Sequence, residues 1–238
     1  MEKVKINICG HDFPKQIQKL FEGTTVYDTG CHSGATVLYL DSGYYVKIDE
    51  KGKLRREVEM VQWFDRMKMG AELVTFISEE KDYMVTKAVK GEDATHWLKD
   101  PEHLCEVLAK TMRRLHDLPP ESVPVSPCMD IYEQMRKNPS EDSEKIETVI
   151  RKMRSNTLIH GDFCLPNVMM QDWQFQAFID VGLAGIGDRH IDIFWALWSL
   201  EYNLKTDQYR DQFLNLYGRD RVDMDVLALV ESVELRDE

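Results

Sequence analysis

The stretch TLIHGDFCLPNVMMQDWQFQAFIDVGLAG, residues 157–185, decides which fold and which chemistry this chain is expected to have. It is mostly apolar, yet it contains the polar residues His160, Asp162, Asn167 and Asp180. Buried or half-buried polar groups cost free energy unless another group pairs with them. Because the apolar residues around them provide no such group, these side chains predict partners from outside the stretch.

The spacing of these residues is typical of phosphoryl transfer. Asp162 and Asn167 are five positions apart in H-G-D-F-C-L-P-N, as in the kinase catalytic loop H-R-D-x-x-x-x-N. Asp180 follows in a D-x-G at the end of a predicted strand, 174–181. We expect Asp162 to accept the proton of an attacking hydroxyl, and oxygen ligands from Asn167 and Asp180 to hold Mg²⁺ on a triphosphate. His160 is expected to hold the loop by hydrogen bonds.

Two other roles are alternatives for the same residues: an ordinary turn and a metal-dependent hydrolase. An aspartate beside a glycine often makes an ordinary turn. A metal-dependent hydrolase built on His160 and Asp162 lacks the second histidine or carboxylate cluster that such sites need, and His190 is the remaining candidate. The asparagine at the kinase offset and the D-x-G at a strand end favour phosphoryl transfer.

Upstream, Lys47 lies in a predicted strand, 44–48, joined to another, 34–40, by the hairpin turn Asp41-Ser42-Gly43. A kinase lysine in this place binds phosphates and pairs with a helical glutamate. The predicted helix 53–68 offers Glu57 and Glu59. Glu57 has apolar neighbours along the helix, where an unpaired carboxylate is costly, so Glu57 is predicted to pair with Lys47.

Two further features near Lys47 are candidates for nucleotide contacts. Strand alternation puts Tyr45 on the same face as Lys47, about 7 Å along, where its ring is expected either to lie against a purine or to be a structural aromatic of the sheet. The segment GCHSGAT, residues 30–36, is expected to fold over phosphates through backbone N–H groups and the Ser33 hydroxyl. An ordinary glycine- and serine-rich turn is the alternative for this segment.

The pattern along the chain predicts an α+β fold with two lobes. The first 89 residues are strand-rich, and most of the remainder is helical, including a helix that begins after Asp100 and ends before Pro119. The polar segment 136–148 is expected to be an exposed loop, and Asp192 is expected to cap a helix over 193–204. We predict an N-terminal nucleotide-binding lobe, 1–89, and a C-terminal catalytic and substrate-binding lobe, 90–238.

Composition narrows the class of protein further. The chain has 238 residues, of which 43% are hydrophobic and 30% charged, the balance of a soluble globular protein. Its 42 acidic residues exceed its 30 basic ones, which argues against nucleic acid as a partner. We expect no membrane span and no secretory signal, and hence a cytoplasmic protein. Five scattered cysteines argue against a disulfide framework and against structural zinc.

With both halves in view, the chain resembles the aminoglycoside phosphotransferases, particularly the 3'-phosphotransferases (kanamycin kinases). The resemblance extends from residue 33 to 218 and rests on SGATVLYL, YYVKI, RREVEMVQWF, MRRLH, HGDFCLPNVM, FIDVGLAGIGDRHIDI and LYG. It implies a protein-kinase-like bilobal fold, with Asp162 as the catalytic carboxylate and Asn167 and Asp180 as magnesium ligands.

The resemblance also implies roles for residues outside the catalytic loop. These are Lys47 as the phosphate anchor with Glu57 as its partner, Ser33 as a phosphate-loop contact, Tyr45 as an adenine-stacking ring, a hinge that pairs with the purine near Thr86, Lys87 and Val89, and Asp188 as a brace for the catalytic loop. It implies ATP, with GTP as an alternative, and Mg²⁺ as cofactors.

The acceptor implied by the resemblance is the 3'-hydroxyl of an aminoglycoside, a polycationic small molecule that suits an acidic lobe. Candidate ammonium contacts are Glu141, Asp142, Glu144, Glu231 and Glu234, with solvated surface as the alternative for each. The chain departs from its relatives in three places: a short acidic segment, 136–155, Leu183 where they commonly carry arginine, and no terminal aromatic residue.

Two alternatives remain open at this point. The first is a kinase of the same fold that acts on another small alcohol, such as choline or a metabolite amine or sugar. The second is a catalytically silent nucleotide-binding module. A silent relative is expected to lack one of Lys47, Asp162, Asn167 or Asp180, and this chain has all four.

Overall fold

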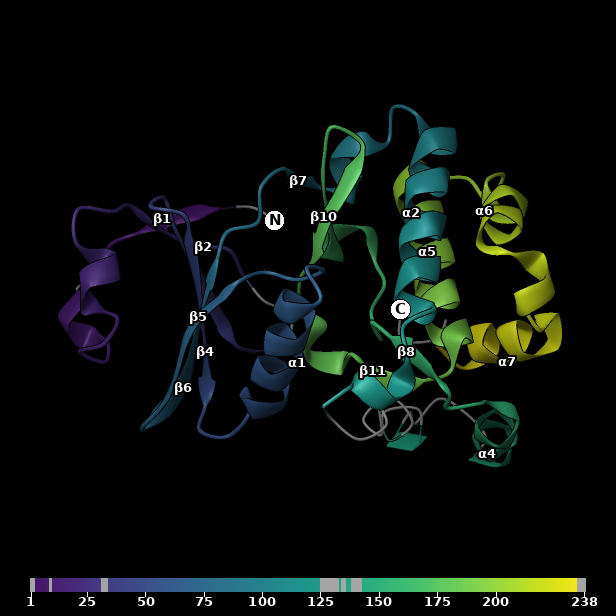
Figure 1. The fold of residues 1–238 in the computed structure, drawn as a ribbon, viewed down its shortest axis with the longest axis horizontal. Helices are drawn as coiled ribbons and strands as arrows, with labels where there is room; N and C mark the ends of the chain where they lie inside the picture. Colours follow the sequence, from purple (N-terminus) through teal and green to yellow (C-terminus); the bar gives the residue numbers. More distant parts are fainter. Residues whose placement is uncertain are drawn as a thin grey trace. The chain divides into compact units, whose positions relative to one another are not determined.

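The fold is described from a computed structural model, which describes residues 3–8, 10–30, 34–124, 133, 136–137 and 143–234. They form two compact units, Met1–Val89 and Lys90–Glu238. Figure 1 shows that strands dominate the first unit and helices the second. The predicted α+β class is therefore confirmed. Among the helices of the described residues, none is both long enough and apolar enough to cross a membrane.

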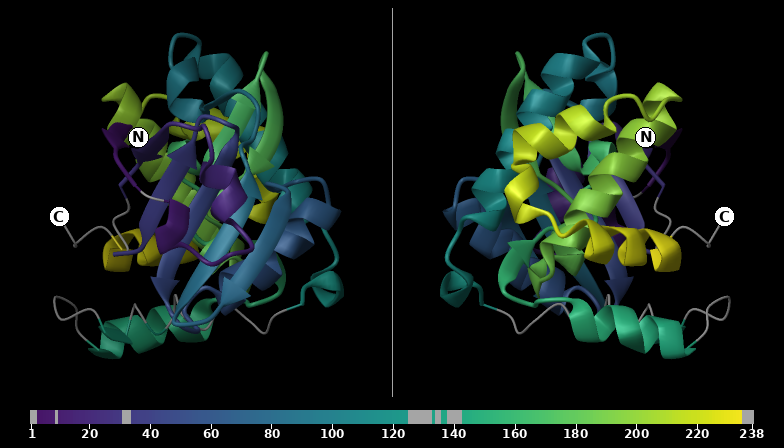
Figure 2. Two further views of the ribbon diagram at one scale, coloured as in Figure 1. Left: turned by 90° about the vertical axis from the view of Figure 1, so that its left-hand side faces the viewer. Right: turned by 90° about the vertical axis from the view of Figure 1, so that its right-hand side faces the viewer.

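The first unit is built on one antiparallel sheet of six strands in the order β1-β2-β3-β4-β6-β5. The left-hand view of Figure 2 looks onto this sheet. The predicted hairpin is confirmed, because β3 and β4 pair in register from Leu40 opposite Tyr44 to Thr36 opposite Ile48. The elements are β1 Val4–Ile6, β2 Val26–Asp28, β3 Thr36–Leu40, β4 Tyr44–Glu50, α1 Arg55–Arg66, β5 Leu73–Ser78 and β6 Lys81–Lys87.

Strand alternation separates the two faces of this sheet. Leu38, Leu40 and Val46 lie in a buried cluster with Phe13 and Phe21, whose rings stack with centroids 4.1 Å apart. These two rings come from the segment of short 3-10 turns, Gly10–Asp12 and Gln18–Phe21. Residues that alternate with Val46 along β4 point to the opposite face of the sheet. One side of the sheet therefore forms a core, and the other side carries Lys47.

A buried carboxylate fixes the turn that leads into α1. Asp82 of β6 accepts hydrogen bonds from the Ser78 hydroxyl at 2.6 Å, the Gly52 backbone N–H at 2.8 Å and the Leu54 backbone N–H at 3.0 Å. Burial alone raises the pKa of this carboxyl, but the three donors together hold it below its ordinary value. Because Leu54 immediately precedes α1, this contact anchors the start of the helix that carries Glu57.

Replacing Asp82 by asparagine is expected to lower the free energy of unfolding at neutral pH. The variant should also lose less of its remaining stability than wild type does when the pH falls. The folded pKa of Asp82 lies below the unfolded value of about 3.9, so its contribution is complete above that pH and disappears as the pH falls through the folded pKa. Urea denaturation of wild type and Asp82→Asn between about pH 7 and pH 3 measures this, and the gap should narrow toward acid. A difference in unfolding free energy between wild type and Asp82→Asn that stays constant or widens in acid would contradict a lowered pKa for Asp82. Glu80→Gln, in the exposed turn before β6, is the matched control.

The second unit is mainly helical, with two small sheets of order β10-β9-β7 and β11-β8. Helix α2 packs against α5 and α6, and α7 packs against α4 and α5. The right-hand view of Figure 2 looks onto the last two helices, drawn in yellow. The elements are β7 Glu92–Asp93, α2 Pro101–His116, α4 Ser143–Lys152, β8 Thr157–Ile159, β9 Val168–Gln171, β10 Gln174–Phe178, β11 Gly185–Gly187, α5 Arg189–Leu204, α6 Arg210–Tyr217 and α7 Met224–Glu234.

Two predictions about the second unit were wrong. The segment 136–148 is not all loop, because α4 begins at Ser143 and buries Ile146 and Val149 one turn apart. Asp192 does not cap a helix, because α5 begins earlier and its N-cap is Asp188, whose carboxylate accepts the His190 backbone N–H. Both errors come from tertiary contacts that local polarity does not reveal.

Candidate active site

The loop from His160 to Asn167 connects β8 to β9 and requires glycine at its second position. Gly161 has φ of +85°, and a Cβ atom there would lie 2.7 Å from the carbonyl oxygen of Leu183. A side chain at this place would therefore collide with backbone, which cannot move out of the way cheaply. Glycine thus lets the loop approach the D-x-G segment, residues 180–182.

Asp162 and Asn167 face each other within this loop. The Asn167 side-chain nitrogen donates to the Asp162 carboxylate oxygen Oδ2 at 2.8 Å and to the Asp162 backbone carbonyl at 3.0 Å. Asn167 is buried, whereas Asp162 is half-buried. Because the amide nitrogen is used twice, the amide oxygen is the atom left to act as a ligand.

The segment that carries Asp180 is joined to this pair by a backbone hydrogen bond of the preceding residue, Ile179. The Ile179 backbone N–H donates to the Asn167 carbonyl oxygen at 3.0 Å. Asp180 itself is exposed and adopts the left-handed conformation, φ 54° and ψ 51°, which is uncommon for a residue with a side chain and concentrates at functional sites. Asn167 and Asp180 thus present oxygen donors from two adjoining segments.

His160 is structural, as predicted. Its Nε2–H donates to the Ile179 carbonyl oxygen at 3.0 Å, and its Nδ1 accepts the Asp162 backbone N–H at 3.3 Å. The carbonyl can only accept and the N–H can only donate, so Nε2 is the donor of this ring and Nδ1 is its acceptor. One imidazole therefore ties Asp162 to the strand end that carries Asp180.

Behind the loop, the carboxylate of Asp192 takes the bracing role. It accepts the backbone N–H groups of His160 and Gly161, both at 2.8 Å, and a bond from His116 Nε2 at 3.0 Å. On its other side, His116 Nδ1 lies 2.8 Å from the Tyr217 hydroxyl. Burial raises the pKa of Tyr217 to about 12, so its hydroxyl remains a donor to the imidazole. A buried chain from α6 through α2 and α5 thus orients the loop from His160 to Asn167.

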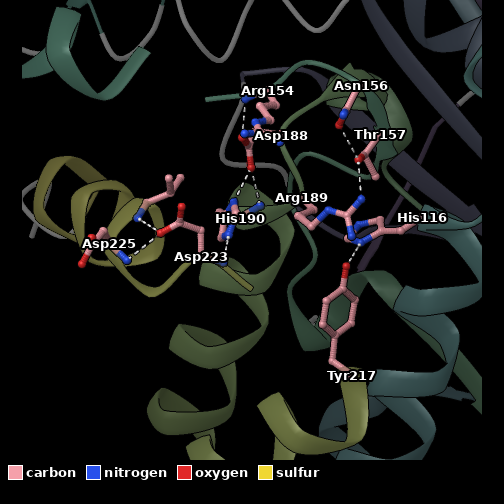
Figure 3. A network of polar contacts seen from close by, with 11 residues as sticks. His116, Arg154, Asn156, Thr157, Asp188, Arg189, His190, Tyr217, Asp223 and Asp225 are labelled. Carbon is pink, nitrogen blue, oxygen red and sulfur yellow. Dashed lines mark hydrogen bonds and ion pairs between the residues drawn. The ribbon is translucent and has the colours of Figure 1, made fainter. Parts of the chain in front are cut away.

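The bracing role that the resemblance implies for Asp188 was wrong. Asp188 caps α5 and binds His190, and it accepts the Arg154 backbone N–H at 2.5 Å, as Figure 3 shows. His190 in turn accepts the Asp223 backbone N–H at 2.9 Å, next to the start of α7. These contacts hold the helices of the second unit together, while Asp192, one turn further along α5, contacts the loop.

Cys164 follows Asp162 closely and is a free thiol. Burial, followed by the negative charge of Asp162, raises the pKa of this thiol far above its ordinary value. The thiol therefore stays protonated, and its nucleophilic form is disfavoured. We assign it no chemical step.

In the first unit, Lys47 and Glu57 form the ion pair predicted for them. The Lys47 ammonium lies 2.8 Å from both carboxylate oxygens of Glu57. The two side chains are 14% and 10% exposed, so the pair is largely shielded from water. Such shielding strengthens the attraction and fixes the direction of the ammonium group.

The structure describes some of the other residues predicted to contact the nucleotide. Tyr45 stacks obliquely on Tyr39 of the neighbouring strand, with centroids 5.0 Å apart. At the predicted hinge, Thr86 and Lys87 end β6, and Val89 ends the first unit. The backbone N–H groups of Lys87 and Ala88 donate to Glu72 and Gly43, both at 2.9 Å, so neither is available to a purine. Ser33 lies outside the described residues.

Of the five acidic residues proposed for substrate contact, the side chains of Glu144 and Glu231 are described. Glu231 on α7 is partly buried and bonded to Arg210 of α6, which offsets its charge. Glu144 is exposed in the first turn of α4. Glu234 ends α7, but its side chain lies outside the described part, as do Glu141 and Asp142 entirely. The proposed substrate contacts of these five acids therefore stay a prediction.

Sequence reasoning missed several residues that position the site. Asp192 and His116 brace the loop, and the Ser199 hydroxyl accepts the Leu165 backbone N–H at 3.0 Å. One signal was available: Asp192 stands within the otherwise apolar run 191–198, where a carboxylate needs partners. Its position at the start of the predicted helix made capping the simpler interpretation.

Comparison with known proteins agrees with this geometry. The model of the phosphotransferase enzyme family matches residues 16–229. The probable aminoglycoside 3'-phosphotransferase of Lactococcus lactis subsp. lactis (strain IL1403) is 36% identical over 259 aligned positions, covering 99% of this chain and 98% of the relative. The aminoglycoside 3'-phosphotransferase of Niallia circulans is 27% identical, covering 72% and 74%.

Among solved structures, the crystal structure of aminoglycoside-3'-phosphotransferase of type VIII has a TM-score of 0.74 at 22% identity. The match covers 96% of this chain and 99% of that one. The GDP and kanamycin complex of APH(2")-IIIa has a TM-score of 0.65 at 16% identity and covers 91% and 85%. The chain therefore belongs to the phosphotransferase enzyme family, and it has the protein-kinase-like fold of the aminoglycoside phosphotransferases.

Proposed function

We propose that the protein transfers the γ-phosphoryl group of ATP to a hydroxyl of an aminoglycoside, and specifically to the 3'-hydroxyl, which would inactivate the antibiotic. The observation that carries this proposal is the hydrogen bond from Asn167 to the Asp162 carboxylate, in a loop joined to the Asp180 segment. The names of the Lactococcus lactis and Niallia circulans relatives support the choice of acceptor.

In this proposal Asp162 accepts the proton of the attacking hydroxyl. Its half-buried carboxylate is oriented by the amide of Asn167 and, through the backbone, by Asp192, so it meets the acceptor with little reorganisation. The ammonium of Lys47, held in place by Glu57, binds the α- and β-phosphates.

The donor set fits magnesium. Within the described residues, no three His, Cys, Asp or Glu side chains gather at one point, which disfavours an all-protein zinc site. The amide oxygen of Asn167 and the carboxylate of Asp180 are hard oxygen donors, and Mg²⁺ is commonly held by one or two such ligands together with substrate phosphates. When bound, Mg²⁺ neutralises charge on the phosphate oxygens.

The test is incubation of the purified chain with kanamycin, Mg²⁺ and ATP, followed by mass spectrometry of the antibiotic. We expect a mass increase of one phosphate group, and NMR of the product to place it on the 3'-oxygen. Turnover of choline or another alcohol, with none of kanamycin or neomycin, would favour the first alternative. Nucleotide binding without turnover of any alcohol would favour the silent module.

The nucleotide donor and the cellular location complete the proposal. The proposed donor is ATP, with GTP as the alternative, and parallel reactions with the two nucleotides compare them. The cytoplasmic location stays a prediction from the sequence.

A further inference from the structure

Three aromatic side chains form a stripe along helix α5. Trp195, Trp198 and Tyr202 follow one another at spacings of three and four, which puts them on one side of the helix. The Trp195 and Trp198 rings meet edge-on at 5.7 Å, and the Trp198 and Tyr202 rings stack at 5.2 Å with 14° between their planes. We call these residues the aromatic stripe.

The aromatic stripe is open to solvent at one end. Trp195 and Trp198 are half-buried, whereas Tyr202 is 54% exposed, one of the few large apolar residues exposed in the described part of the chain. A ring that served only the core would be covered. Here, stacking on Trp198 covers one face of the Tyr202 ring and fixes its orientation. The opposite face, which we call the open face, is turned away from Trp198.

The aromatic stripe belongs to the helix that contacts the loop carrying Asp162. On the neighbouring side of α5, Asp192 accepts backbone N–H groups from the loop, and Ser199 accepts the Leu165 N–H. Trp198 immediately precedes Ser199, so its side chain lies about 100° around the helix from the line of loop contacts. A ligand on the stripe would thus lie along the same helix that positions the loop with Asp162.

The open face of the stripe attracts cations. The Lys205 ammonium lies over the Tyr202 ring, 4.1 Å from its centroid. Lys205 is exposed and ends α5 in the left-handed conformation, so a long flexible side chain folds back onto the ring. The exposed Glu201 and the partial negative charge of the helix C-terminus favour a cation at the same place.

We propose that the aromatic stripe binds an amino-sugar ring of the acceptor, with Tyr202 and Trp198 under its C–H face and an ammonium group on the open face of Tyr202. Lys205 occupies that face in the absence of the acceptor, and the substrate ammonium displaces it. This inference rests on the proposed function, because it names residues that select a cationic sugar. Neither the Lys205 ammonium nor the substrate ammonium gains or loses a proton when one replaces the other on the Tyr202 ring.

Kinetics and direct binding of kanamycin to three variants test this inference. Tyr202→Ala should raise both the KM and the calorimetric Kd for kanamycin by about five- to tenfold, with kcat and the KM for ATP within about twofold of wild type. Tyr202→Phe keeps the ring and should bind kanamycin like wild type. Lys205→Ala removes the internal competitor and should lower the Kd by about two- to threefold.

The outcomes separate this inference from the proposed function. Unchanged kanamycin affinity in Tyr202→Ala overturns the inference, even if wild type turns kanamycin over normally. A loss in Tyr202→Phe equal to that in Tyr202→Ala also overturns it, because the hydroxyl rather than the ring would then act. Binding of kanamycin without phosphorylation overturns the proposed function. The comparison of kanamycin affinity between Tyr202→Ala and Tyr202→Phe stays valid in that case. A change in sedimentation without a change in kanamycin affinity would make the stripe a contact between copies and would overturn the inference.

Discussion

Replacing Asp162 by asparagine is expected to lower kcat by about 10³-fold while ATP still binds. Asparagine cannot accept the proton of the acceptor hydroxyl. It keeps a side-chain oxygen that can take the hydrogen bond from Asn167, which is 2.8 Å long in the wild type. The loop should therefore keep its conformation, and the loss should appear in kcat rather than in the KM for ATP or in thermal stability.

Steady-state kinetics with kanamycin and calorimetric titration with a non-hydrolysable ATP analogue measure these quantities. The matched control is Asp172→Asn, an exposed aspartate at a positive φ in the turn between β9 and β10. It should change neither kcat nor nucleotide affinity. If Asp162→Asn turned over at the wild-type rate, a different residue would have to serve as the base.

Replacing Asp192 by alanine is expected to lower the free energy of unfolding by about 4 kcal/mol. The change leaves the backbone N–H groups of His160 and Gly161 and the imidazole of His116 without their acceptor, all in a buried region. The same change loosens the loop that carries Asp162, so activity should fall with stability.

Urea denaturation checks this expectation, with a lower midpoint at an unchanged slope. Asp192→Asn keeps one acceptor oxygen and should lose less stability than alanine. The control is Asp207→Ala, an exposed position just beyond α5 that should change stability by less than about 0.5 kcal/mol. If Asp192→Ala unfolded no more easily than this control, the brace would contribute nothing to stability.

The elements that sequence patterns predicted well are those determined by local spacing. The β3–β4 hairpin follows from two β-favouring runs and a turn, and α1 follows from apolar residues at helical spacing. The Lys47–Glu57 pair was predictable for the same reason, because the apolar neighbours of Glu57 lie within one turn of it. The hairpin and the helix need only residues close together in the chain, whereas the ion pair also depends on the kinase pattern at residues 160–182.

The second unit was harder because its decisive contacts join residues far apart in the sequence. Asp188 and Asp192 are both acidic residues near the start of one helix, and either is a plausible cap from local pattern alone. Only the contacts of Asp192 with the His160–Asn167 loop and with His116 distinguish the brace from the cap. The segment at α4 shows the same limit, since its polar composition concealed the two apolar residues that it buries.

Gly161 restricts how the loop from His160 to Asn167 could be regulated by phosphorylation. Protein kinases carry arginine here, in H-R-D, and they order phosphorylated segments through pairs between arginine and phosphate. In this chain the carbonyl of Leu183 leaves no room for any side chain at that place. An arginine that binds a phosphorylated segment beside Asp162 is therefore sterically excluded at position 161 of this chain.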